Sequence, residues 1–195
     1  MRPGIYRAAA ALLLAALLSA CAGPPRLPLN KLSEAKPGET IVVGRVEIVP
    51  PLAENEQKLT VGSGYLKDQL ILITSDKFRR LTAEPTPGEY TGRIEARLDK
   101  DFTVRSSNKP FYILAGGIMT NGEDGQMAWF PGGLEVPIRP GDKAIYIGTL
   151  RYYRNEFMDV KKTVLVDDYA RANAEFKKTY GARYSLRKAL VRPVR

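Results

Sequence analysis

The sequence predicts a mainly β protein: an antiparallel β-sandwich, immunoglobulin-like or prealbumin-like, followed by one C-terminal α-helix. Short runs of alternating apolar and polar residues recur between residues 39 and 166, and turn-forming clusters separate them. After residue 166 the apolar period lengthens to that of a helix. A small barrel is the competing architecture, and the lack of long helices between the strands argues against a doubly wound α/β fold.

Residues 93–98 show the strand pattern most clearly. Ile94, Ala96 and Leu98 face one side and charged residues face the other, which is typical of a sheet with one solvated face. Turn pairs such as Asn121-Gly122 supply the backbone conformations that tight reversals need. The predicted strands are residues 40–49, 92–98, 110–120, 134–138 and 143–153, the last forming a hairpin with residues 156–166.

Residues 167–181 form the predicted helix. Either of two aspartates can cap its start, lysines occupy its last turn, and Gly181 can end it. An apolar stripe recurs at spacings of three and four residues, which predicts that one helix face packs against the sheet or closes one end of it. The stripe consists of Tyr169, Ala172, Phe176 and Tyr180.

Residues 1–20 have the pattern of an export signal. Arg2 and Arg7 precede an unbroken run of small and apolar residues. As a helix this run covers roughly 20 Å, less than the roughly 30 Å of a hydrocarbon core, which disfavours a membrane-spanning anchor. Residues 21–38 contain four prolines and predict an extended tether between the leader and the body.

The single cysteine of the chain directly follows that run. The segment Leu18-Ser19-Ala20-Cys21 resembles the lipobox of bacterial lipoproteins. This resemblance implies a diacylglyceryl group on the Cys21 thiol, cleavage before Cys21 and acylation of its amine, and two or more acyl chains give stable membrane anchoring. By the sorting rule of lipoproteins in enteric bacteria, Ala22 in place of aspartate implies the periplasmic face of the outer membrane. An ordinary secretory signal with an incidental cysteine is the alternative.

The amino-acid composition limits the metal sites and catalytic mechanisms that the chain can form. The chain has no histidine and a single cysteine, so serine–histidine catalysis and an intrachain disulfide are excluded. Once Cys21 is acylated, the imidazole and thiolate ligands of zinc, copper and haem sites are missing as well. The acidic pairs Glu54/Glu56 and Asp167/Asp168 fit solvated loops and helix capping better than acid–base catalysis. We therefore expect a non-enzymatic protein without metal or cofactor, with a carboxylate-based hydrolase as the minor alternative.

Of the formal net charge of +9, Arg2 and Arg7 of the leader account for +2, and the last 25 residues, which include a predicted basic tail at residues 182–195, account for +7. If the tail is helical it is amphipathic, and its plausible partners are anionic lipid, lipopolysaccharide phosphates or an acidic envelope protein. Export makes nucleic acid a poor candidate. A soluble, partly disordered tail is the alternative. The candidate binding residues are Arg183, Arg187, Lys188 and Arg192.

Trp129 and Phe130 form the other candidate site. Beside Gly132-Gly133 they would make a platform for a sugar ring or an anchor for a protein partner, if exposed. The favoured alternative is that both begin a strand and fill the core. Together these features predict a membrane-anchored envelope lipoprotein that acts as a binding or assembly module. A glycan- or lipid-binding lipoprotein that uses the Trp129 loop is the second hypothesis.

Overall fold

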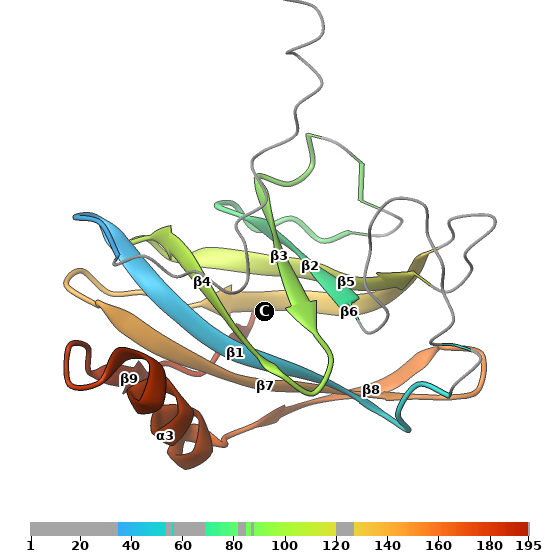
Figure 1. Ribbon diagram of the computed structural model, residues 1–195. Coiled ribbons are helices and arrows are strands. Elements are labelled where there is room, and N and C mark those ends of the chain that lie inside the picture. The colour runs from blue at the N-terminus through green and yellow to red at the C-terminus, as the bar shows by residue number, and fades with distance from the viewer. Residues whose placement is uncertain are drawn as a thin grey trace, which may run out of the picture.

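In the part of the chain that it describes, the structure, a computed structural model, has two β-sheets and the helix α3 (Figure 1). It describes residues 35–53, 56, 69–81, 85–86, 88–119 and 127–194. The mainly β class with a C-terminal helix is confirmed. The elements are β1 (Glu39–Val49), β2 (Gln69–Ser75), β3 (Gly92–Arg97), β4 (Asp101–Ser107), β5 (Phe111–Met119), β6 (Met127–Val136), β7 (Ala144–Arg154), β8 (Val160–Val166), α3 (Tyr169–Tyr180), β9 (Leu186–Lys188) and β10 (Arg192–Pro193).

The strands form two five-stranded sheets that lie face to face (Figure 1). Sheet A has the order β4-β1-β7-β8, with β9 also pairing with β7, and sheet B has the order β10-β6-β5-β2-β3. Sheet B is antiparallel throughout, but in sheet A β7 runs parallel to both β1 and β9. The predicted antiparallel pairing is therefore found for β1 with β4 and for β7 with β8, and it is wrong for β7 with β1 and β9. A hairpin turn pairs only strands that are neighbours in the sequence. β1 and β7 are separated by most of the strands of sheet B, so turn signals could not indicate their pairing.

Most predicted strands are found close to their expected positions. Those at 40–49, 92–98, 110–120 and 143–153 correspond to β1, β3, β5 and β7. β6 begins earlier than expected, and β2 and β4 were not predicted. β8 begins later because the reversal after β7 takes five residues, in which Asn155 Oδ1 accepts hydrogen bonds from the N–H groups of Phe157 and Asp159.

The main hydrophobic core lies between the two sheets. β2 shows how it is built: Leu70 and Leu72 point into this core, while Ile71 and Ile73 are buried on the opposite face of sheet B. A strand that is apolar at successive positions is typical of a sheet covered on both faces. Sheet B therefore has an outer face that also needs a cover.

Helix α3 covers the outer face of sheet A. Ala172 and Phe176 are buried there, as the predicted stripe requires, and the Phe176 ring stacks on Tyr180 with centroids 4.4 Å apart. The helix ends at Gly181, whose φ of 60° is favourable for glycine and whose N–H donates to the Lys177 carbonyl at 2.8 Å. The sheet residues beneath α3 are Ile41, Val43, Ala144, Tyr146 and Leu186.

The C-terminal segment completes both sheets, because β9 joins sheet A and β10 joins sheet B. Between them Ala189 and Val191 are buried, and their N–H groups donate to the carbonyls of Tyr146 and Ile147 at 2.9 and 3.0 Å. The helical form considered for the basic tail therefore does not occur in its described part, residues 182–194. The strands of the sandwich continue past residue 166 into the segment predicted as a basic tail.

Candidate functional site

Among the described residues, part of the loop after β2 covers the outer face of sheet B. After β2 the chain turns over this face, and Phe78 packs against Tyr112 of β5 with ring centroids 5.8 Å apart. Leu114 is buried below, while Leu81 and Trp129 stay half-buried beside it. An apolar surface of this kind is unusual for one face of a sandwich unless something packs on it.

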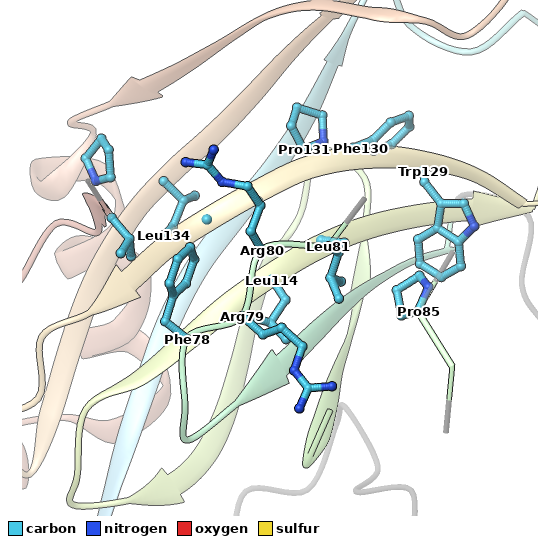
Figure 2. A pocket seen from close by; sticks show the side chains of 15 residues that line it. Phe78, Arg79, Arg80, Leu81, Pro85, Leu114, Trp129, Phe130, Pro131 and Leu134 are labelled. Carbon is cyan, nitrogen blue, oxygen red and sulfur yellow. The ribbon is translucent and has the colours of Figure 1, made fainter. Parts of the chain in front are cut away.

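A pocket of about 580 Å³ lies on this face (Figure 2). Trp129 and Pro85 stand at one end of it, and Phe78 and Leu134 at the other. The lining comes from the loop after β2, from strands β5 and β6, and from the end of the C-terminal segment. The lining residues are Phe78, Arg79, Arg80, Leu81, Pro85, Leu114, Ala115, Trp129, Phe130, Pro131, Gly132, Gly133, Leu134, Pro193 and Val194.

An irregular stretch of β6 shapes the pocket wall. Pairing with β5 shifts register here, and a Cβ atom added at Gly132 would lie 2.4 Å from the carbonyl carbon of Leu114. Gly133 follows with a φ of 75°, a conformation that side chains rarely adopt. Its carbonyl accepts a hydrogen bond from Val194 at 2.8 Å, which fixes the end of the C-terminal segment at the pocket. The two glycines leave bare backbone between the apolar side chains.

Two arginines are the charged side chains of the lining. Arg79 is exposed, lies 3.6 Å from Glu89 and turns away from β6 in Figure 2. Arg80 reaches across β6 in the same view, and no charged partner for it is found among the described residues. The pocket therefore combines mostly apolar side chains with a positive charge on its rim that has no charged partner in the part of the chain that the structure describes.

The structure separates the two predicted aromatic candidates. Phe130 points into the core, where its side chain is 2% exposed and its ring lies 5.1 Å from that of Tyr152. Trp129 points to the outer face, where its indole lies over Gly117 of β5, so close that a Cβ there would be 2.9 Å from the ring. The buried Nε1 atom of Trp129 has no hydrogen-bond partner among the described residues. The core interpretation holds for Phe130, and Trp129 forms part of the pocket.

Two of the predicted basic residues are bound within the protein. Arg187 donates from Nε to a carboxylate oxygen of Asp142 at 2.6 Å and from Nη2 to the Pro137 carbonyl at 3.1 Å. This contact holds the pKa of Asp142 below its usual value. Lys188 binds Asp167 at 2.8 Å and lowers the pKa of that carboxyl as well. Both cations therefore join β9 to the body.

The other two predicted basic residues do not lie with them. Arg183 is exposed in the turn after α3, and Arg192 is exposed on β10, next to the pocket residue Pro193. The four cations thus form no common surface. Their sequence proximity gave no sign of this, because the segment passes from one sheet to the other.

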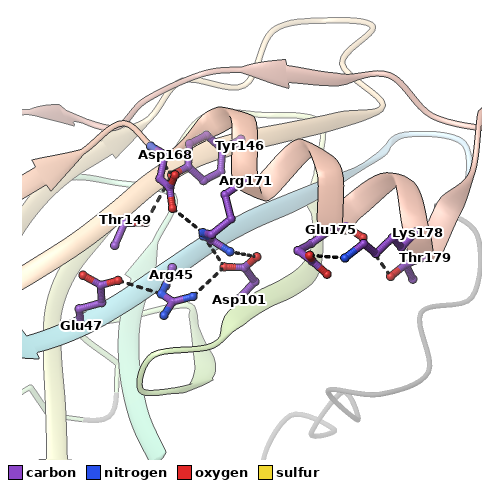
Figure 3. Close-up of polar contacts among 10 residues, drawn as sticks. All are labelled: Arg45, Glu47, Asp101, Tyr146, Thr149, Asp168, Arg171, Glu175, Lys178 and Thr179. Carbon is purple, nitrogen blue, oxygen red and sulfur yellow. Dashed lines mark hydrogen bonds and ion pairs between the residues drawn. The ribbon is translucent and has the colours of Figure 1, made fainter. Parts of the chain in front are cut away.

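A row of alternating charges crosses from sheet A to the start of α3 (Figure 3). Arg171 donates to both carboxylate oxygens of Asp101 at 2.8 Å and to the carboxylate of Asp168. Arg45 lies 3.9 Å from Asp101 and 2.9 Å from Glu47. Asp101 raises the pKa of Arg171 through these hydrogen bonds. Each charge faces an opposite one, so the row ties α3 to β4 and β1 rather than forming a binding site.

The remaining predicted sites are structural or outside the described part. Glu56 binds Arg154 and Asp167 binds Lys188, while Cys21 and Glu54 lie outside the described residues. Among the described residues no cluster of acidic, cysteine or histidine side chains could hold a metal ion, and no helix has the length and apolar character needed to cross a bilayer. Comparison with protein-family models, curated proteins and solved structures finds no significant match.

Proposed function

We propose that the protein is a lipid-anchored, non-enzymatic binding module of the cell envelope. In this proposal the acyl groups on Cys21 hold it at the periplasmic face of the outer membrane, and the pocket over sheet B binds a small glycan or lipid. The observation that carries the binding function is the pocket of about 580 Å³. Its volume falls within the roughly 300–1,000 Å³ of small-molecule sites, which are also largely apolar with few polar groups.

The position of the pocket supports this proposal. It is formed by side chains from a loop and by two rigid strands, an arrangement that holds binding groups in place on a stable scaffold. Trp129 stands on β6 and offers a large, rigid apolar surface to a ligand. The second hypothesis from the sequence, a ligand site at Trp129, is thus better supported than assembly through the tail.

Assembly through the basic segment has less support because its charges are partly neutralised. Arg187 and Lys188 bind Asp142 and Asp167, and a cation that already binds a carboxylate attracts an external anion weakly. The segment also contributes Val194 to the pocket. Its role in this proposal is therefore to complete the fold and one wall of the ligand site.

The proposal is tested by native mass spectrometry of the mature protein purified from membranes. We expect a covalent lipid mass at Cys21 and a non-covalent ligand mass on the wild-type protein. Leu81→Glu should lose the ligand and keep the covalent lipid, because it places a carboxylate on the pocket wall. Phe157→Glu is the matched control, since Phe157 is 75% exposed in the turn after β7. An unmodified Cys21 contradicts the anchor, and a ligand retained by Leu81→Glu contradicts the pocket.

A further inference from the structure

The side chains that line the sheet B pocket include few polar groups. Apart from the indole of Trp129, Arg79 and Arg80 carry the only polar side-chain groups among the 15 lining residues. Among the described residues, no carboxylate, amide or hydroxyl side chain belongs to the lining. The side chains therefore offer hydrogen-bond donors but no acceptor.

This inventory distinguishes between the two ligand classes. A glycan carries many hydroxyl groups, and each needs a hydrogen-bond acceptor for its proton when water is removed. Trp129 could stack on a sugar ring, but within the described lining only a few backbone carbonyls could accept hydrogen bonds from its many hydroxyl groups. A hydrocarbon chain has no such requirement and gains from contact with the leucine, proline and aromatic side chains.

The positive charge of Arg80 at the pocket rim sets a second requirement on the ligand. Arg154, Arg171 and Arg187 each bind a carboxylate with at least one contact of 2.8 Å or less. Arg80 has no such contact among the described residues, and the loose pair of Arg79 with Glu89 leaves the local charge positive. A planar guanidinium binds carboxylate and phosphate groups in a bidentate manner, so the rim fits an anionic head group.

We infer that the pocket binds a lipid with a single hydrocarbon chain and an anionic head, with the chain along Trp129 and Leu114 and the head beside Arg80. This inference rests on the proposed function, because it names the ligand class of the same pocket. Arg80 is then the residue that selects for negative charge. A fatty acid and a lysophosphatidic acid share this chemistry and differ in the head.

Trp129 provides the readout, since it is the single tryptophan of the chain. The mature lipid-anchored protein is placed in phosphatidylcholine vesicles and titrated with a fatty acid whose chain carries bromine, which quenches indole fluorescence on contact. We expect saturable quenching of Trp129. A brominated lysophosphatidic acid is titrated in a second experiment. Whichever of the two brominated lipids binds more tightly identifies the preferred head group. The brominated fatty alcohol is the neutral control, and a soluble oligosaccharide forms the glycan arm.

Two variants test the role of the charge. Arg80→Ala should weaken binding of the brominated acid about threefold to fivefold, the range of a partly exposed ion pair, and leave binding of the alcohol unchanged. Arg139→Ala is the matched control, because Arg139 is also exposed but does not line the pocket. The urea midpoint of Arg80→Ala should equal that of the wild-type protein, which separates a binding effect from a folding effect.

The outcomes separate the inference from the function on which it rests. Equal weakening of the acid by both arginine variants, or no weakening by Arg80→Ala, overturns the anionic head. A fluorescence change with the oligosaccharide and none with the lipids overturns the lipid class and leaves the binding module standing. The absence of any response of Trp129 to all four probes overturns both proposals.

Discussion

The outer faces of the two sheets are both apolar, but they are covered in different ways. On sheet A, helix α3 buries Ala172 and Phe176, which are 0% and 4% exposed. On sheet B, the described part of the loop after β2 leaves Phe78 and Trp129 half-buried around a pocket of about 580 Å³. A helix that packs along a sheet excludes water from the whole interface, whereas a loop leaves room for a ligand.

The charged side chains beside the two outer faces also differ in whether they are paired. Beside α3, Arg171 is bound by Asp101 and Asp168, while Arg80 at the sheet B pocket has no charged partner among the described residues. Paired charges hold elements together, and an unpaired charge on a pocket rim is available to a ligand. The closed face therefore contributes to stability, and under the proposed function the open face is the one that binds a ligand. The comparison predicts that equivalent changes on the two faces have unequal effects.

The largest effect is expected from removing the segment that connects the two sheets. Truncation after Gly181 deletes β9 and β10 and the buried Leu186 and Val191, which contribute about 1.5–3 kcal/mol each in addition to their backbone hydrogen bonds. This loss approaches the roughly 5–15 kcal/mol of a whole domain, so the truncated chain should not unfold cooperatively in urea. Circular dichroism and Trp129 fluorescence measure the transition.

The control for the truncation keeps the backbone and removes the charges. Arg187→Gln with Lys188→Gln loses the exposed pair of Lys188 with Asp167, expected to contribute about 1 kcal/mol or less, and the pair of Arg187 with the largely buried Asp142, expected to contribute about 1.5–3 kcal/mol. This double variant should still unfold cooperatively, at a midpoint moderately below that of the wild-type protein. A truncated chain that also unfolds cooperatively at that midpoint would show that the segment is a detachable tail.

The second prediction compares one phenylalanine from each face. Phe176→Ala should lower the free energy of unfolding by about 3–5 kcal/mol, because the helix cannot close over the space left beside Tyr180. Phe78→Ala should cost only about 1 kcal/mol, since Phe78 is half-buried in a loop at the pocket. Urea unfolding of both variants gives the difference. Equal costs, or a larger cost at Phe78, would mean that the two faces are packed alike.

The sequence predicted the closed face better than the open one. Tyr169 to Tyr180 could be recognised because helical periodicity is local, and β1 could be recognised from its near-continuous apolar residues. The parallel pairing of β1 with β7 could not, since it depends on how distant segments meet. An immunoglobulin-like or prealbumin-like type for the sandwich stays a prediction.

The pocket was only partly visible in the sequence. Trp129 was a candidate because it is the single tryptophan of the chain. Pro131 and the two glycines after it predicted a loop, where the structure has a bulged strand. Phe78 and Arg80 carry no spacing signal, and they reach Trp129 only through the pairing of β2, β5 and β6. No local pattern reports contacts of this kind.

The basic segment shows the opposite error, a strong sequence signal with a structural explanation. The partner of Arg187 is Asp142, 45 positions earlier, and the partner of Lys188 is Asp167, 21 positions earlier. The charge count along the sequence cannot show this neutralisation. The spacing of Leu186 and Ala189 fits an amphipathic helix, but it also fits a strand and a following loop that bury both.

A clamp at the end of sheet A provides the third comparison, between a buried and an exposed carboxylate contact. Arg154 ends β7, and its side chain is 4% exposed. It donates to both carboxylate oxygens of Glu56 at 2.7 and 2.6 Å and to the carbonyls of Pro50 and Pro51. These contacts hold the chain where it leaves sheet A. On the sheet B side, Glu89 accepts hydrogen bonds from Thr86 in an exposed turn.

Both carboxyls have a pKa below the ordinary 4.5, through hydrogen bonds from Arg154 to Glu56 and from Thr86 to Glu89. A carboxyl with a lowered pKa stabilises the fold above pH 4.5, and this contribution is lost as the pH falls through its folded-state pKa. Glu56→Gln should lower the free energy of unfolding by about 1.5–3 kcal/mol at neutral pH and flatten its acid dependence, because it leaves a buried guanidinium without its counter-charge. Glu89→Gln should change the acid dependence much less, since water screens its contacts. Urea unfolding at a series of pH values measures both, and an equal flattening by the two variants would contradict the clamp.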